Sequence, residues 1–311
     1  MAKVIQKPDR KRNANPRKGM RRMLQLIGGL IGLLIVLILT LFIVGRGRLN
    51  RAPAAAGSPV TVPTDAEAIV RGEKLANISG CTACHGSNLA GTPFIDAAPI
   101  GFVPAPNLTS GAGGVMDAYS ADSYELAIRH GVAADGRTMV SMPSDHYAHY
   151  GDDDLGDLIA YLQQVDPQDN ELGTRQMMFP GNIIFGIFAY SSWPVNLVDH
   201  AAVGGDAPVA DSSAEYGEYL VSIASCQSCH AENLAGNYGQ LDTPRGPNLT
   251  IWPEQHGFEA FVAAVRSGQG SDGEVLDEEM PWSSYARFTD SEMEALWAYL
   301  NTVEVLEDNA P

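Results

Sequence analysis

Cysteine is scarce in this chain, with four in 311 residues. All four lie in two short phrases, CTACH at residues 81–85 and CQSCH at residues 226–230. Cysteines grouped in this way cannot staple a whole fold through disulfides, so apolar cores must stabilise it. The chain is 45% hydrophobic, which is enough for ordinary globular cores.

Positively charged residues are also scarce after the N-terminal part of the chain. Residues 52–311 hold 8 Lys or Arg against 36 Asp or Glu, a net charge of −28. This charge excludes a nucleic-acid-binding surface and repels anionic lipid. It fits attraction to a basic docking face on a redox partner protein. It fits a surface kept soluble by charge equally well, and both interpretations stay open.

Long apolar runs are also few, and one dominates: LQLIGGLIGLLIVLILTLFIV, Leu24–Val44, without a charged residue. As a helix it would reach about 31 Å, the thickness of a bilayer core, and it is too long for the apolar part of a cleaved signal peptide. We predict a retained transmembrane helix over 23–45, although RAPAAAG behind it has the small residues of a cleavage site. Gly28 and Gly32 form a GxxxG pattern, for which a lipid-facing helix without a partner is the simpler interpretation.

Charge on the two sides of this run predicts its orientation. Residues 1–22 carry nine Lys or Arg and one Asp, whereas Arg46, Arg48 and Arg51 follow the run. The positive-inside tendency therefore predicts a cytoplasmic basic tail over 1–22 and a periplasmic remainder, in a bacterial inner membrane. Residues 46–63, rich in Gly, Pro and Ala, are predicted to be a tether.

The rest of the chain repeats itself. GEKLANISGCTACHGSNLAG aligns with GEYLVSIASCQSCHAENLAG. The phrases PNLT, IRHG or VRSG, Met-Pro and AYL then follow in the same order in both copies. Five landmarks in one order indicate a tandem duplication. We predict domains over 64–165 and 212–304, an inter-domain segment over 166–211 and a tail over 305–311.

The periodicity of both copies is helical. TDAE at Thr64, SSAE at Ser212 and TDSE at Thr289 are predicted capping boxes. The last helix of the first copy is expected from about Asp153 to Gln164, and no alternating strand pattern competes. The predicted fold is all-α. The Gly- and Pro-rich loops have too little periodicity for a core of their own, which a large apolar cofactor would explain.

The phrase CxxCH admits four interpretations. A zinc site needs four ligands, but the two pairs lie 145 residues apart in separate repeats. A redox dithiol expects a βαβ setting, and two disulfides leave the adjacent histidines unexplained. Covalent attachment of two c-type haems uses every residue: Cys81, Cys84, Cys226 and Cys229 form the thioethers, and His85 and His230 ligate the iron.

The second iron ligand is predicted from the repeat. A thioether favours the reduced iron and so suits an electron carrier. Met142 and Met280 stand at aligned Met-Pro phrases, whereas Met139 has no aligned counterpart and stays an alternative. The distal alternatives His130, His146 and His149 are better explained as surface or hydrogen-bonded histidines. The residues that follow differ between the copies, SDH against WSS, and are expected to give the two haems unequal potentials.

Each copy resembles a class I cytochrome c domain in its CxxCH, PNLT, Met-Pro and AYL phrases. The resemblance implies that the carbonyls of Pro106 and Pro247 hold the proximal histidines through their second ring nitrogen. Tyr161 and Tyr299 would pack near the haems. A weaker expectation places the hydroxyls of Tyr147 and Tyr285 on haem propionates.

The predicted function is single-electron transfer by a membrane-anchored diheme cytochrome c between respiratory partners, without a small-molecule substrate or catalytic residue. A subunit of a larger dehydrogenase, oxidase or quinol-oxidising complex is the first alternative. A diheme enzyme such as a peroxidase is a weaker one, because it needs an open iron. For the apolar segment within 166–211, packing between the two haem domains is favoured over a partner-binding or membrane-surface patch.

Overall fold

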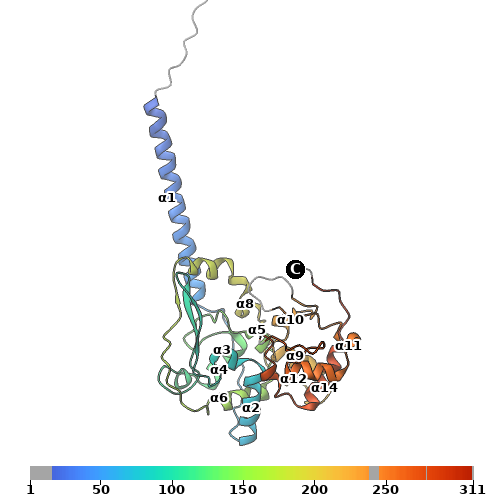
Figure 1. The fold of residues 1–311 in the computed structure, drawn as a ribbon. Helices are drawn as coiled ribbons and strands as arrows, with labels where there is room; N and C mark the ends of the chain where they lie inside the picture. The colour runs from blue at the N-terminus through green and yellow to red at the C-terminus, as the bar shows by residue number, and fades with distance from the viewer. Residues whose placement is uncertain (1–15, 238–244, 278, 310–311) are drawn as a thin grey trace, which may run out of the picture.

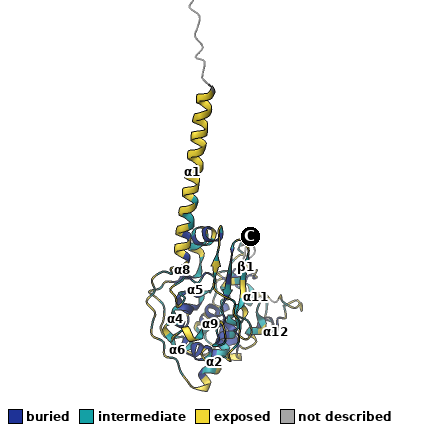
Figure 2. Ribbon diagram, turned by 90° about the vertical axis from the view of Figure 1, so that its left-hand side faces the viewer, coloured by how far each residue is buried: buried dark blue, intermediate teal, exposed yellow. Residues whose placement is uncertain are grey.

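One long helix stands apart from the globular part of the molecule (Figure 1). The computed structural model describes residues 16–237, 245–277 and 279–309. Helix α1, Pro16–Leu49, is the one described helix that is long and apolar enough to cross a membrane. Figure 2 shows that it is exposed along most of its length. Most of the predicted basic tail, residues 1–15, lies outside the described residues.

The end of α1 differs from the predicted boundary. The helix continues beyond residue 45 to Leu49, which is buried against Val103 and Val140 of the globular part. The predicted start of the tether at residue 46 is therefore wrong, because this stretch is helical and packed. Residues 52–64 contain no helix or strand.

The first repeat forms a small helical domain around its cysteines. Its helices are α2 (Ala66–Ile78), α3 (Cys81–His85), η1 (Met116–Ala118), α4 (Ala121–His130), α5 (Ser144–Tyr147) and α6 (Asp152–Leu162). The second repeat gives α9 (Ala214–Ile223), α10 (Gln227–His230), α11 (Trp252–Gln255), α12 (Phe258–Ser267), α13 (Trp282–Tyr285) and α14 (Asp290–Leu300). The all-α prediction holds for the body of both domains.

The helix starts confirm one capping box of the three. At Thr289 the hydroxyl accepts from the backbone N–H of Glu292, whose carboxylate accepts from the N–H of Thr289. Helix α2 is instead capped by Asp65, and α9 by Ser213, each one residue later than predicted. A neighbouring Asp or Ser competes with the expected residue as the cap acceptor, and the chain path decides between them.

Glycine allows the first and last helix of each domain to cross closely. A Cβ at Gly72 of α2 would collide with the carbonyl of Asp157 in α6. At the same place in the second domain, a Cβ at Gly217 of α9 would collide with the carbonyl of Ala295 in α14. The duplicated crossing fixes the frame on which both cysteine phrases sit.

A small sheet departs from the prediction that no strand competes. Strands β1 (Thr92–Ala97), β2 (Gly101–Ala105) and β3 (Gln176–Met177) pair antiparallel in the order β1-β2-β3. The hairpin interrupts the loop of the first domain, and β3 comes from the inter-domain segment. Pairing with a strand more than 70 residues away is a tertiary contact that local periodicity does not encode.

The inter-domain segment lies against the first domain and the foot of α1. It contains α7 (Gly181–Ile183), the π-helical turn η2 (Ile184–Phe188), η3 (Tyr190–Ser192) and α8 (Pro194–Leu197). Both α7 and η2 contact α1, while α8 contacts α5. The favoured expectation that this segment packs between the two haem domains is therefore wrong.

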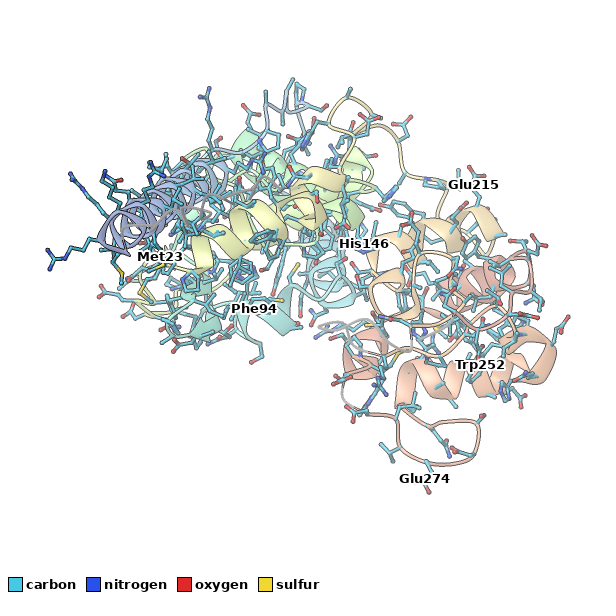
Figure 3. All side chains as sticks on the ribbon, turned by 90° about the horizontal axis from the view of Figure 1, so that it is seen from above. Met23, Phe94, His146, Glu215, Trp252 and Glu274 are labelled. Carbon is cyan, nitrogen blue, oxygen red and sulfur yellow. The ribbon has the colours of Figure 1, made fainter. Side chains whose placement is uncertain are left out.

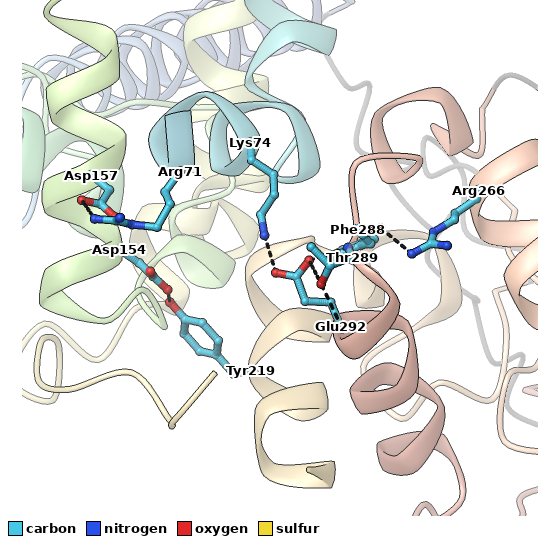
Figure 4. A network of polar contacts seen from close by, with 9 residues as sticks. All are labelled: Arg71, Lys74, Asp154, Asp157, Tyr219, Arg266, Phe288, Thr289 and Glu292. Carbon is cyan, nitrogen blue, oxygen red and sulfur yellow. Dashed lines mark hydrogen bonds and ion pairs between the residues drawn. The ribbon is translucent and has the colours of Figure 1, made fainter. Parts of the chain in front are cut away.

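The two domains meet directly through polar contacts, drawn in Figure 4. The hydroxyl of Tyr219 in α9 donates to Asp154 Oδ2 in α6 at 2.6 Å. Lys74 of α2 pairs with Glu292 of α14. Apolar residues from both domains join in one core cluster, among them Leu155 and Leu296. The domains therefore form a continuous body.

Candidate haem sites

Each cysteine phrase sits on a short helical turn that follows the first helix of its domain. The turn α3 begins after Gly80 and ends at Gly86, and both glycines have a positive φ, of 74° and 82°. This places Cys81, Cys84 and His85 on about one and a half turns of chain. Such a turn can present two thiols and an imidazole to one planar group.

Both proximal histidines donate a hydrogen bond to a proline carbonyl. The ring Nδ1–H of His85 lies 2.8 Å from the carbonyl oxygen of Pro106, and that of His230 lies 2.8 Å from the carbonyl oxygen of Pro247. A carbonyl can only accept, so Nδ1 carries the proton and Nε2 is the nitrogen able to ligate iron. These contacts are the ones that the family resemblance implies. The ligand role itself stays a prediction.

Both PNLT loops are built in the same way. In each, the asparagine side chain accepts from the backbone N–H of the threonine two residues on, Asn107 with Thr109 and Asn248 with Thr250, at 2.9 Å in both loops. The chain beyond each last helix returns to this loop, where Gln168 or Leu306 accepts from the asparagine side chain. Residues just outside the predicted domain ends thus support the loops that hold the histidines.

Burial sets the protonation of the site. It lowers the pKa of His85 and of His230 below 6.5, although the hydrogen bond to proline acts against this. It raises the pKa of Cys81 and of Cys226 to about 12. A reactive dithiol needs a lowered thiol pKa, so these thiols do not suit redox exchange. Neutral imidazoles and protonated thiols suit haem ligation and thioether formation.

An apolar cavity of about 280 Å³ lies beside the cysteine turn of the first domain. His85 and Met142 both line it, together with Val103 of β2 and Ile128 of α4. Met139 lines it as well, so the cavity does not separate the two methionines. An imidazole nitrogen, a thioether and two thiols around one apolar space form a donor set that fits a c-type haem.

The distal histidine alternatives lie elsewhere, since none of His130, His146 and His149 lines this cavity. His130 is buried beside Glu125, with its Nδ1 2.9 Å from Nδ1 of His200. His149 is exposed. Figure 3 shows His146 at the junction of the domains, where its Nε2 lies 2.9 Å from the hydroxyl of Ser228.

The weaker expectation for the tyrosines is wrong. The hydroxyl of Tyr147 donates to the carbonyl of Ser79, and that of Tyr285 donates to the carbonyl of Ala224 at 3.0 Å. Buried phenols satisfied in this way fasten the Met-Pro helix to the end of the first helix. Tyr161 and Tyr299 pack at the helix crossings, and Tyr161 does not line the cavity.

One pair of supporting residues was missed. Arg129 donates to the carbonyl of Tyr150 at 2.6 Å, and Arg266 donates to the carbonyl of Phe288 at 2.6 Å. Each arginine ties α4 or α12 to the chain that follows the Met-Pro helix. The shared Arg of IRHG and VRSG was the available signal.

The two distal loops differ where the copies differ in sequence. In the second domain the indole of Trp282 covers Gly268, within 2.7 Å of where a Cβ would lie. In the first domain the equivalent Gly131 faces the smaller Ser144, and Val195 of α8 fills the remaining space. The inter-domain segment thus packs against the end of α4 in the first domain.

Sequence comparison decides the family. A family model described as cytochrome c matches residues 69–166 and again 214–304, more than half of the chain. The chain belongs to the cytochrome c family. Within the described residues, no three His, Cys, Asp or Glu side chains gather as a metal cluster, so the zinc alternative has no site there.

Curated relatives point the same way. The fructose dehydrogenase cytochrome subunit of Gluconobacter japonicus is 28% identical over 280 residues, covering 78% of this chain and 55% of that protein. The gluconate 2-dehydrogenase cytochrome c subunit of Pantoea cypripedii is 33% identical over 225 residues, covering 66% and 47%. A diheme c-type cytochrome of Cereibacter sphaeroides is 27% identical over 266 residues, covering 76% and 86%.

The chain spans about half the length of the first two relatives. The doubled family match and the diheme relative show that it is a cytochrome with two c-type haems. By name, two of these relatives are cytochrome subunits of dehydrogenases.

Proposed function

We propose that this diheme cytochrome is anchored by α1 in the bacterial inner membrane and passes single electrons between respiratory redox proteins on the periplasmic side. Domains 64–165 and 212–304 would each hold one haem, with His85 and Met142 as axial ligands in the first, and His230 and Met280 in the second. The observation that carries the proposal is the pair of histidines whose Nδ1–H groups donate to Pro106 and Pro247.

The protein chain orients the groups that would hold each haem. When bound, the haem supplies a one-electron Fe(III)/Fe(II) couple. The proline carbonyls fix the tautomer and the orientation of each imidazole, and the hydrogen bond makes Nε2 a better donor. With haem bound, apolar lining residues such as Val103 and Ile128 would limit the access of water to the iron, which would favour the iron state of lower charge.

The orientation of the anchor rests on charge. The basic residues that precede the apolar run favour a cytoplasmic N-terminus, which places both domains outside. The acidic surface of these domains suits a partner with a basic docking face, whose attraction would raise the association rate. Such attraction weakens as salt is added.

A second candidate function is favoured by the relatives. Two of them are named as cytochrome subunits of fructose dehydrogenase and gluconate 2-dehydrogenase. The chain would then receive electrons from the catalytic subunit of a membrane-bound dehydrogenase. Extraction in mild detergent separates the two functions: a lone carrier elutes as a single chain, whereas a subunit elutes with partner proteins.

A redox titration tests the ligand assignments. We expect Met142→Ala and Met280→Ala each to lower the potential of one haem by on the order of 0.1 V, since loss of a soft thioether removes stabilisation of Fe(II). Each variant should also weaken the methionine–iron charge-transfer band. Met139→Ala is the matched control and should change neither property.

The Met139→Ala control also shows which results would contradict the ligand assignments. If Met139→Ala lowers the potential of the first haem and Met142→Ala does not, the distal assignment in the first domain is wrong. If neither substitution changes any spectrum, methionine ligation of that haem is wrong.

A further inference from the structure

The segment at the foot of α1 has an unusual composition for this acidic protein. Gln176–Val198 contains no Asp, Glu, Lys or Arg. Five large apolar side chains of this segment are exposed, Phe188 the most at 73%; we call them the apolar collar. The collar consists of Met178, Phe179, Ile184, Phe188 and Leu197.

Two glycines allow η2 to pack directly against α1 near the end of the apolar run. A Cβ at Gly45 of α1 would collide with the carbonyl of Asn182, and a Cβ at Gly186 would collide with the carbonyl of Gly45. The backbones of α1 and η2 therefore touch. Gly45 directly follows Val44, the last residue of the uncharged run, so η2 crosses α1 within about 2 Å of the end of that run.

One side of the turn η2 packs against the rest of the protein, and the other side is exposed. Phe185 packs with Trp193 in the small core that holds Leu49. Ile184 and Phe188 are four residues apart, and both are exposed, so they project from the same side of the turn. In Figure 1 the segment runs across the top of the globular part, at the foot of α1.

Groups suited to a lipid–water interface surround the collar. The guanidinium of Arg48 lies 4.9 Å from the ring centre of Tyr190. A hollow of about 320 Å³ beside the crossing is lined by Arg46 and Asn50, and also by Arg175, whose guanidinium donates to the carbonyls of Thr138 and Leu49. Aromatic rings and arginines are typical of the interfacial zone, where guanidinium groups meet lipid phosphates.

We propose that the apolar collar inserts into the outer surface of the same bilayer that α1 spans, so that the first haem domain is seated on the membrane and does not swing from a tether. The proposal rests on the membrane anchoring proposed for α1. A lipid surface is favoured over a protein partner because η2, which carries Ile184 and Phe188 of the collar, crosses α1 where the apolar run ends.

Thiol accessibility tests the seating in the full-length holoprotein. The chain is reconstituted through α1 in phosphatidylethanolamine–phosphatidylglycerol nanodiscs, and Phe188→Cys is treated with a charged, membrane-impermeant maleimide. The native cysteines are consumed by the haem thioethers, so the introduced thiol is the one that reacts. Val209→Cys is the matched control, since Val209 is 79% exposed and lies outside the collar.

We expect the Phe188→Cys variant to react about tenfold more slowly than the Val209→Cys variant, because an interfacial side chain is buried several ångströms into the lipid. On the unsubstituted chain, a diazirine-bearing phospholipid should cross-link within residues 178–197. Equal maleimide rates without lipid adducts would overturn the seating and leave the collar as a surface for a protein partner.

Different results would contradict the anchoring by α1 and the seating of the collar on the membrane. Loss of the chain from nanodiscs would contradict anchoring by α1. A chain that is retained, with a reactive thiol at position 188, contradicts only the seating. Neither result bears on the redox titration of the two haems.

Discussion

Asp154 is a half-buried carboxylate at the contact between the two domains, and the phenol of Tyr219 donates a hydrogen bond to it. The hydroxyl of Tyr219 lies 2.6 Å from Asp154 Oδ2 and in turn accepts from the backbone N–H of Gly151. Burial raises the pKa of Asp154, and the hydrogen bond from Tyr219 partly opposes this. The ionised carboxylate therefore disfavours the folded state at neutral pH, and the hydrogen bond from the phenol reduces that cost.

Two substitutions separate the hydrogen bond from the charge. We expect Tyr219→Phe to lower the free energy of unfolding at pH 7 by about 1–3 kcal/mol, because a buried acceptor loses its donor. Asp154→Asn should leave it unchanged or raise it, since an amide oxygen still accepts and no charge is buried. Denaturant titration of the holoprotein, followed by circular dichroism, measures both.

The sign of the pH dependence follows from the raised pKa. The folded state binds the proton of Asp154 more tightly than the unfolded state, so the cost of the buried charge is present at pH 7 and disappears as the pH falls to 3.8. If Asp154→Asn raises the free energy of unfolding at pH 7, this gain must disappear as the pH falls to 3.8. Equal losses for both variants at pH 7 would contradict this account.

At the scale of elements, glycine decides how the helices of each domain cross. Gly72→Ala places a methyl group against the carbonyl of Asp157, and Gly217→Ala does the same against that of Ala295. We expect each to lower the free energy of unfolding by about 1–3 kcal/mol through overpacking. Thermal or denaturant unfolding of the holoprotein measures this.

Gly47→Ala is the matched control, because Gly47 is also helical and has nothing within 4 Å of the added methyl. It should be neutral or slightly stabilising, given the higher helix propensity of alanine. A neutral Gly72→Ala variant would show that the two helices can separate without cost.

At the scale of the whole molecule, a titratable histidine lies in the contact between the two domains. It joins the Met-Pro loop of the first domain to the CQSCH turn of the second. His146 Nε2 lies 2.9 Å from Ser228, which stands inside the CQSCH phrase. Burial lowers the pKa of His146 below 6.5, and His149 adds to this, whereas Asp145 and Glu232 act against it. The docked state therefore favours the neutral ring.

We expect the domain contact to weaken as the pH falls below 6.5, because the ring protonates more readily once the domains separate. Amide hydrogen exchange of residues 226–230, corrected for the intrinsic rate, should become faster over that range. His146→Gln keeps a polar side chain without titrating, so its exchange should not show this extra dependence. The same dependence in both proteins would exclude His146 as its source.

The sequence by itself determined the chemistry of the two sites. Two thiols and an imidazole must lie within five residues to serve one haem, so CTACH and CQSCH are complete as local phrases. The resemblance to class I cytochrome c domains then pointed to Pro106 and Pro247, whose carbonyls accept from the two histidines.

Only the tertiary structure decided the contacts between segments that are far apart in the chain. The β3 strand, the burial of Leu49, the carbonyl partners of Tyr147 and Tyr285, and the place of His146 between the domains all depend on such contacts. No local periodicity encodes them, because each joins residues that are far apart in the chain.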